Sequence, residues 1–119
     1  MIKVVSKENV IPTPTDAQGF VNVLKCVPLN TKNIAVRVFD IMPGGYTDLH
    51  KHGHVHINFV QYGTLGIFTT NRDKPTYTLK AGDFCSIDGN DKHRYKNVGK
   101  TPVRFICVTE AYAEPKTAL

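Results

Sequence analysis

The sequence has no apolar run long enough to cross a bilayer, and no window shows the periodicity of an amphipathic helix. The first residues lack the apolar core and small-residue cleavage site of an export signal, so we expect a cytoplasmic protein. The three cysteines, Cys26, Cys85 and Cys107, form no C-x-x-C pair. This spacing favours reduced core thiols in a reducing compartment over disulfides.

Acidic residues are fewer than basic ones, 10 against 15, and the formal net charge is +5. The basic residues gather only in segment 92–100, where bases and other side chains alternate as Lys92, His93, Arg94, Tyr95, Lys96 and Asn97. On a strand, this alternation places the bases on one face. We interpret that face as solvated and expect neither nucleic-acid nor membrane binding, because no nucleic-acid motif accompanies it.

Short runs of alternating or β-branched residues, cut by glycine, proline and asparagine, recur along the chain. They predict strands at residues 4–5, 20–27, 34–41, 49–52, 56–62, 66–70, 76–79, 84–87, 94–98 and 103–109. Pro12 and Pro14 predict an extended loop, and Pro28 and Pro43 predict strand ends. So many short strands favour an all-β antiparallel sandwich or barrel, most simply a jelly roll.

The 119 residues suffice for one domain with its own core. We expect a single domain over residues 1–119, with its core at about 20–110. Residues 1–19 are expected to form an N-terminal arm, and residues 111–119 a frayed tail.

Histidine is concentrated in one glycine-bounded stretch, and the five histidines are His50, His52, His54, His56 and, further on, His93. Imidazole is the commonest protein ligand for transition metals. His50 and His52 would project from the same face of a strand, whereas His56 and His93 open two further strands. Three strands can therefore direct four imidazoles to one point, an arrangement that would be costly without a cation.

These residues resemble the two motifs of the cupin superfamily. The first motif consists of a glycine, five residues, H-x-H, three or four residues, a glutamate, six residues and a glycine. This chain matches it with Gly44, His50, His52, His56 and Gly63. His56 stands in place of the glutamate. The second motif is matched by Gly82, His93 and Asn97. It departs from the family at Asp88, where proline is usual, and at Asn90, where glycine is usual, although asparagine also tolerates a left-handed backbone.

The resemblance implies a jelly-roll β-barrel that binds one divalent metal through His50, His52, His56 and His93, and a homodimer, as is common for small cupins. Four neutral imidazoles leave the metal charge uncompensated, which favours anionic chelating ligands such as enolates, α-keto acids or carboxylates. Imidazole-rich sites favour Fe, Ni, Cu or Zn, and small four-histidine cupins also carry Mn. The identity of the metal therefore stays open.

Further polar residues that could reach a pocket are Arg37, Tyr46, Asp48, Asn58 and Tyr62. Asn58 shares the strand parity of His56, so we expect it to face the same way and to contact substrate. His54 lies in the predicted turn and is interpreted as a rim residue, either a solvated loop histidine or a proton-transfer group. The catalytic acid or base is unknown, because Glu8, Glu110 and Glu114 are the only glutamates and lie near the ends.

The preferred function is a metal-dependent oxidoreductase of the dioxygenase type, acting on a small anionic or enolisable substrate chelated to the metal. Three alternatives stay open. The metal could act as a Lewis acid in a non-redox isomerase, cyclase or lyase; the protein could be a non-catalytic small-molecule sensor or storage module; or the site could be a closed structural zinc.

Overall fold

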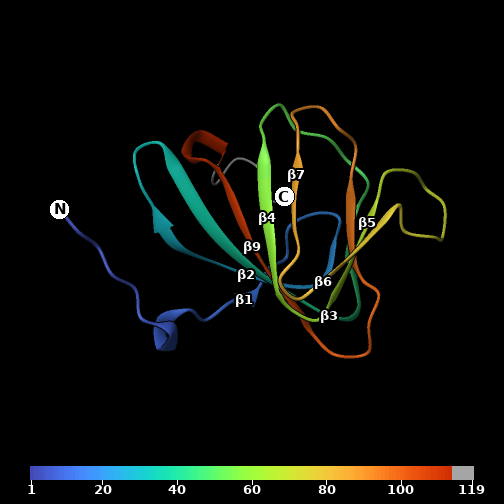
Figure 1. Cartoon of the computed structure of the whole chain (residues 1–119), viewed down its shortest axis with the longest axis horizontal. Coiled ribbons are helices and arrows are strands. Elements are labelled where there is room, and N and C mark those ends of the chain that lie inside the picture. Colours follow the sequence, from blue (N-terminus) through green and yellow to red (C-terminus); the bar gives the residue numbers. More distant parts are fainter. Residues whose placement is uncertain (114–119) are drawn as a thin grey trace.

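A single antiparallel sheet contains all nine strands of residues 1–113, the part of the chain that the computed structural model describes (Figure 1). The elements in chain order are the 3-10 helix η1 (Lys7–Asn9), β1 (Thr13–Pro14), β2 (Phe20–Asn30), β3 (Ile34–Thr47), β4 (His56–Tyr62), β5 (Thr64–Phe68), β6 (Tyr77–Lys80), β7 (Phe84–Ile87), β8 (Arg94–Asn97), β9 (Val103–Glu110) and the 3-10 helix η2 (Ala111–Ala113). Among these residues no helix is long and apolar enough to cross a membrane.

The sheet has the strand order β6-β5-β8-β3-β9-β4-β7, and β2 pairs with β3 and with β1. It curls into a near-closed barrel in which the two end strands, β6 and β7, line the same cavity. The prediction of an all-β antiparallel barrel is therefore confirmed. The N-terminal arm leaves the barrel and extends away from it (Figure 1).

Most of the predicted strands are present, and β4 and β7 have the predicted bounds. Two strand predictions were wrong. Residues 4–5 form no strand and lie in the arm, where Val4 is 83% exposed. Residues 49–52 make an isolated bridge instead of a strand, in which His50 and His93 exchange two backbone hydrogen bonds of 3.1 and 2.9 Å.

The prolines interrupt the sheet less than predicted. β2 continues past Pro28 to Asn30, because a register shift between Cys26 and Leu29 accommodates the missing backbone donor. β3 likewise continues through Pro43 to Thr47. The predicted loop at residues 12–14 contains the short edge strand β1, which pairs with β2.

The chain end begins with η2, and Ala113 there is only 2% exposed. Ala113 is thus buried rather than frayed, whereas Tyr112 is 56% exposed. The rest of the predicted frayed tail, residues 114–119, lies outside the described residues. Cys26, Cys85 and Cys107 form no disulfide among the described residues, and Cys107 is fully buried as predicted, whereas the other two are half-buried.

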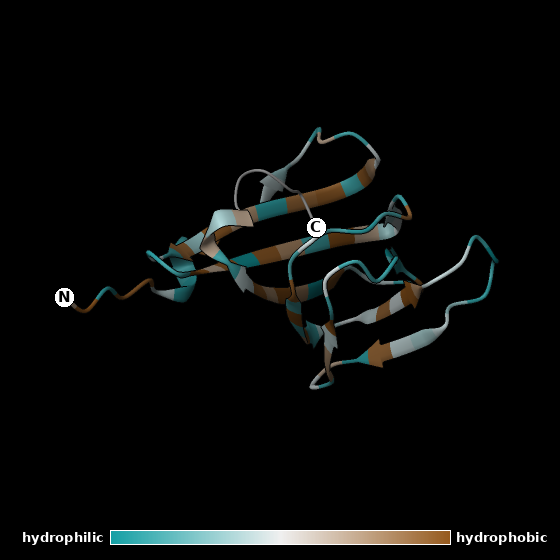
Figure 2. Ribbon diagram, turned by 90° about the horizontal axis from the view of Figure 1, so that it is seen from above, coloured by the Kyte–Doolittle hydropathy of each residue, from teal (hydrophilic) through white to brown (hydrophobic). Residues whose placement is uncertain are grey.

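Apolar and polar residues alternate along the strands (Figure 2), and the inward-facing ones form cross-strand rows. The first row is Phe39, Phe105 and Val60; the second is Arg37, Cys107, Asn58 and Cys85; the third is Ala35, Thr109, His56 and Ile87. The first row belongs to the hydrophobic core, in which the Phe39 and Phe105 rings stack 5.3 Å apart. The interior therefore changes from apolar to polar along β3, β9 and β4.

Candidate metal centre

The histidines converge at the polar end of the barrel, as predicted from their spacing. We call His50, His52, His54, His56 and His93 the histidine cluster. Within it, two groups of three have ligand atoms that all lie within 4.8 Å of one another: His50 with His52 and His93, and His52 with His54 and His56. His52 belongs to both groups. In the part of the chain described, neither group contains a carboxylate or a thiol.

Backbone pairing in the loops holds the cluster together. The bridge between His50 and His93 fixes these residues relative to each other. The backbone N–H of Asn90 donates to the carbonyl of His52, and Asn90 adopts a φ of 71°, the left-handed conformation predicted to be tolerable there. The loop before β4 and the loop before β8 are thereby joined at two points.

His50 and His93 share one orienting device. The Nδ1–H of His50 donates to the Asp48 carbonyl at 2.5 Å, and that of His93 donates to the Asp91 carbonyl at 2.9 Å. A carbonyl oxygen can only accept, so Nδ1 carries the proton in both neutral rings. Nε2 is then the atom of each ring that could ligate a metal, and the ring orientation is fixed in advance.

His56 is oriented by side chains from the second row. Its Nδ1 lies 3.3 Å from Sγ of Cys107 and 3.0 Å from Nη2 of Arg37, which also donates to that sulfur at 3.1 Å. The guanidinium can only donate, so its contact is a hydrogen bond when Nδ1 accepts. In the other tautomer the sulfur accepts the Nδ1 proton, and Nε2 of His56 is then the atom that can ligate a metal. Arg37 is fully buried, so its guanidinium adds a positive charge close to the cluster.

The donor set fits a transition metal. Nε2 of His52 and Nε2 of His56 are buried and have no hydrogen-bond partner among residues 1–113. Buried nitrogens of this kind are costly unless a partner is supplied. A divalent ion among the Nε2 atoms would supply one.

Burial keeps these imidazoles neutral. It lowers the pKa of His52 to about 3, helped by the neighbouring His50, and lowers the pKa of His56 to about 2, helped by Arg37. The pKa of His54 is lowered as well, mainly by burial and secondly by Arg37. Neutral imidazole is the form that binds metal, so the folded site is ready to do so at neutral pH.

His54 lies inside the cluster rather than on a solvated rim. It is 5% exposed, and its ring centroid lies 4.8 Å from that of His52 and 4.6 Å from that of His56. The prediction of a solvated loop histidine was therefore wrong. The loop before β8 lies against this loop, because a Cβ on Gly89 would lie 3.2 Å from the carbonyl carbon of Gly53.

The remaining predicted site residues are divided between the inside and the outside of the barrel. Asn58 is fully buried and faces inward, as its parity with His56 predicted, and its Nδ2 donates to the Tyr95 hydroxyl at 2.8 Å. Arg37 contacts His56. The ring of Tyr46 lies 5.5 Å from the guanidinium carbon of Arg94, and Tyr62, at the far end of β4, packs in the same way on Arg104.

Sequence reasoning missed the partners Cys107 and Tyr95. Cys107 lies directly opposite Arg37 on one side and Asn58 on the other, so it contacts two residues that were singled out. Its role could be recognised only from the register of β3, β9 and β4. The alternation at residues 92–97 placed Tyr95 on the face opposite the bases, but its hydrogen bond with Asn58 was not predicted.

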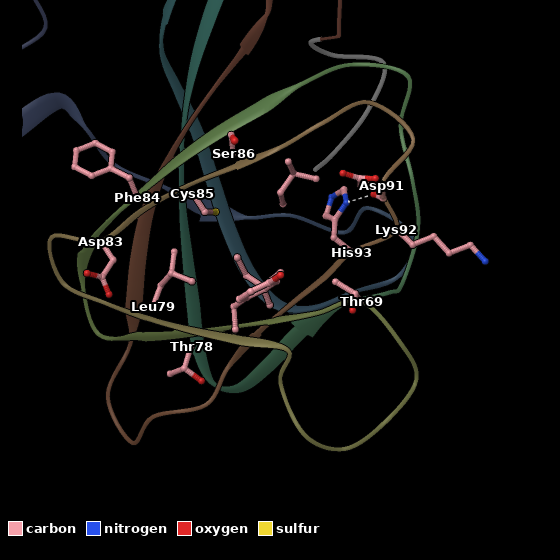
Figure 3. Close-up of a pocket in the computed structure, with 13 residues that line it drawn as sticks. Thr69, Thr78, Leu79, Asp83, Phe84, Cys85, Ser86, Asp91, Lys92 and His93 are labelled. Atoms are coloured by element: carbon pink, nitrogen blue, oxygen red, sulfur yellow. Dashed lines mark hydrogen bonds between the residues drawn. The ribbon is translucent and has the colours of Figure 1, made fainter.

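Two cavities reach the histidine cluster from different sides. The larger, of about 660 Å³, is bounded by β5, β6 and β7 and includes His93, whose hydrogen bond to Asp91 is visible at its border (Figure 3). The smaller, of about 330 Å³, is lined by Gln18, Phe20, Asp48, Leu49, His50 and His52. Both openings provide routes from solvent to the candidate ligands.

Comparison with protein families shows that the model of the Cupin_2 family, described as a cupin domain, matches residues 37–109. An oxalate-binding protein of Thermotoga maritima is 38% identical over 68 residues, which are 56% of this chain and 53% of that protein. Germin-like protein 5-1 of rice (Oryza sativa subsp. japonica) is 36% identical over 88 residues, 71% of this chain and 40% of that protein. The chain thus spans about half, or less, of the length of these curated relatives.

Solved structures give the same fold. The polyketide cyclase RemF from Streptomyces resistomycificus has a TM-score of 0.84 at 18% identity, covering 93% of this chain and 80% of that one. A predicted oxalate decarboxylase from Thermotoga maritima has a TM-score of 0.76 at 25% identity, covering 91% and 98%. At 18% identity, the likeness to the cyclase concerns the fold alone.

Proposed function

The chain belongs to the cupin domain family, and we propose that its histidine cluster binds one divalent transition metal and, through that metal, a small anionic ligand. The proposed ligands are His50, His52, His56 and His93. One observation carries the proposal: two buried Nε2 atoms, on His52 and His56, have no partner among residues 1–113 and lie beside two histidines whose Nε2 lone pairs are already oriented. Whether the ion is Fe, Mn, Ni, Cu or Zn is left to experiment.

Charge supports an anionic ligand. Both groups of candidate metal ligands among the described residues consist of histidine alone, so the protein brings no negative charge to the ion. The buried guanidinium of Arg37, 3.0 Å from His56, adds a positive charge. A carboxylate or enolate would offset both charges, and the name of the oxalate-binding relative supports a ligand of this class.

For the chemistry, we propose a metal-dependent oxidoreductase of the dioxygenase type that acts on a chelated, enolisable substrate. When bound, the metal would supply Lewis acidity and, for a redox-active ion, electron transfer to dioxygen. The protein's part is to hold the imidazoles in their neutral tautomers, to surround the ligand with positive charge and to exclude bulk water. Asn58, with its amide oxygen buried and unpartnered among residues 1–113, is proposed to accept a hydrogen bond from the substrate.

The experiment that tests this chemistry uses tag-free protein reconstituted separately with Fe, Mn, Ni, Cu and Zn. Oxalate, pyruvate and acetylacetone are added without oxygen, and oxygen is then admitted. Oxygen consumption by a redox-active form, but not by the zinc form, is the expected result. Turnover by the zinc form without oxygen would select Lewis-acid chemistry instead, and ligand-induced thermal stabilisation without turnover would select a sensor or storage role.

We further propose that the protein is a cytoplasmic homodimer that takes a small molecule as its partner. Light scattering on the protein as it elutes from a size-exclusion column measures the mass of the assembly directly. A monomeric mass at micromolar concentration would refute the dimer.

A further inference from the structure

The larger of the two cavities, which we call the edge cavity, fills the opening between the two end strands of the sheet. Strands β6 and β7 occupy opposite ends of the strand order, and both line this cavity of about 660 Å³. His93 also lines it, and the His93 ring centroid lies 5.0 to 5.5 Å from those of His50, His52 and His56. The edge cavity is therefore continuous with the histidine cluster.

The size of the edge cavity exceeds the need of a two-carbon acid. Cavities of roughly 300–1,000 Å³ bind drug-sized ligands. Oxalate, held at the histidine cluster, would leave most of the edge cavity to water. The volume indicates a ligand whose body extends from the cluster toward β6 and β7.

The inner walls of the edge cavity are apolar. Ile67 on β5, Leu79 on β6 and Ile87 on β7 line it, and each is less than a tenth exposed. Its polar lining comes from other residues, namely Thr69, Tyr77, Thr78, Asp83, Ser86, Asp91, Lys92 and His93. Water ordered against aliphatic side chains is released when an apolar group replaces it, so this wall favours a ligand with an apolar body.

A polar pair lies behind one wall of the edge cavity. Cys85 lines the cavity and its side chain points into it (Figure 3). Nδ2 of the fully buried Asn58 lies 3.7 Å from Sγ of Cys85. A ligand that reaches past His93 would thus meet this thiol and amide as well as aliphatic carbon, since Cys85 and Ile87 lie two residues apart on β7.

We propose that the edge cavity binds the apolar body, one or two rings in size, of a ligand whose chelating oxygen pair lies at the histidine cluster. The chelating end has adjacent oxygens, as in a 2-hydroxy carboxylate or an enolised carbonyl compound. For the chelating end of the ligand, the inference rests on the proposed metal function. The apolar body would contact Ile67, Leu79 and Ile87, and Phe84 also lines the cavity.

The test uses two probes with the same chelating end, salicylate and 3-hydroxy-2-naphthoate, which differ by one ring. Zinc content is measured first, and affinities for the zinc-loaded protein are then measured by calorimetry. The naphthoate is expected to bind about tenfold more tightly than salicylate, because its second ring enters the edge cavity. Equal affinities of salicylate and the naphthoate would overturn the proposal.

Leu79 and Leu65 provide a matched pair of variants, since they lie opposite each other on β6 and β5 but only Leu79 lines the edge cavity. Leu79→Ala is expected to lower the ratio of naphthoate to salicylate affinity about threefold, and Leu65→Ala to leave it unchanged. If Leu79→Ala does not fold, Leu79→Val takes its place with a smaller shift in the same direction. An equal change in both variants would contradict a local contact.

Methyl NMR separates this proposal from the metal function. If no zinc is retained, the proposed function fails, but the naphthoate is still expected to shift the methyl signals of Ile67, Leu79 and Ile87 in metal-free protein. Zinc retention without such shifts in either form would leave the metal function standing and refute the edge cavity as the binding site.

Discussion

The two ends of the barrel interior lie on the same three strands and have opposite chemistry. Phe39, Phe105 and Val60 form one row of β3, β9 and β4, and all three are fully buried. Four residues further along β4, toward its start, His56 occupies an equally buried position. The first end gains stability from burial, whereas the second buries nitrogens that lack partners among residues 1–113.

This difference indicates that the apolar end holds the fold and the histidine end is organised to bind a ligand. The second row, which contains Arg37, lies between the apolar end and the histidine end and connects them. Arg37 contacts the Phe39 ring on one side, with its guanidinium carbon 5.5 Å from the ring centroid, and His56 on the other. The apolar end thus orients the residues that in turn orient the candidate ligand. Five changes, ordered from the largest expected effect to the smallest, test this division.

Phe105→Ala removes a buried ring from the apolar end. The free energy of unfolding is expected to fall by about 3–5 kcal/mol, because a fully buried ring that stacks on Phe39 and Tyr95 is replaced by a cavity. Denaturant titration measures the loss, and metal analysis of the folded fraction should show unchanged stoichiometry. Loss of metal without loss of stability would reverse the roles assigned to the two ends.

His52→Ala removes one imidazole from the histidine end. It is expected to remove most of the metal, because His52 belongs to both three-histidine groups. His93→Ala should act similarly, since His93 belongs to the group with His50. His54→Ala should retain the metal if His50, His52, His56 and His93 are the ligands. Metal content after dialysis decides between these expectations, and equal content in all three variants would overturn the ligand assignment.

Acid should destabilise the metal-free protein through the histidine end. The folded state holds the pKa of His52 at about 3 and that of His56 at about 2, whereas an unfolded histidine titrates near ~6.5. Below that pH the unfolded chain binds more protons, so the free energy of unfolding decreases as the pH falls. The loss is at most ~1.4 kcal/mol per pH unit for each histidine. His56→Gln should flatten the profile measured by denaturation between pH 7 and 4; an unchanged slope would contradict the assignment.

Cys107→Val removes the sulfur that accepts from Arg37 and can accept the Nδ1 proton of His56. Metal affinity is expected to fall about tenfold, as for other residues that orient a ligand through its second nitrogen. Cys107→Ser, which keeps an acceptor, should lose less, and nitrogen NMR of the imidazoles should show His56 with its proton on Nδ1 only when an acceptor is present. The same tautomer in both variants would exclude a positioning role.

Asn90→Ala tests the loop that joins the two histidine segments. The cost is expected to be about 1 kcal/mol of stability, because alanine adopts the left-handed conformation less readily than asparagine. Asn90→Gly, the usual cupin residue, should be neutral within a few tenths of a kcal/mol. Thermal unfolding of both variants measures the difference. Equal costs would show that the side chain, not its conformation, matters.

The parts of the fold that depend on local pattern could be predicted from the sequence. Alternation identified β4 and β7 at their observed bounds, and motif spacing identified the convergence of the histidines. The strand predicted at residues 49–52 failed because histidines two apart imitate strand alternation, while Gly53 and the bridge to His93 set a loop instead. Such loop geometry depends on a segment some forty positions away in the chain.

Residues whose roles depend on strand register could not be predicted. His54 was expected in solvent because a turn residue carries no signal for burial. Here its ring packs against those of His52 and His56, and the loop before β8 lies against its backbone. Cys107 looked like an ordinary core thiol until β9 was placed between β3 and β4. In both cases the missing information was which segments lie side by side.

The central claim is that the histidine end binds one metal and keeps room for a ligand. X-ray absorption spectroscopy of stoichiometrically loaded, tag-free protein tests it most directly, before and after addition of oxalate. We predict one ion per chain with imidazole ligands and further light-atom ligands that change when oxalate is added. Failure to retain a stoichiometric ion, or a closed tetrahedral shell of protein ligands that oxalate leaves unchanged, would contradict the account.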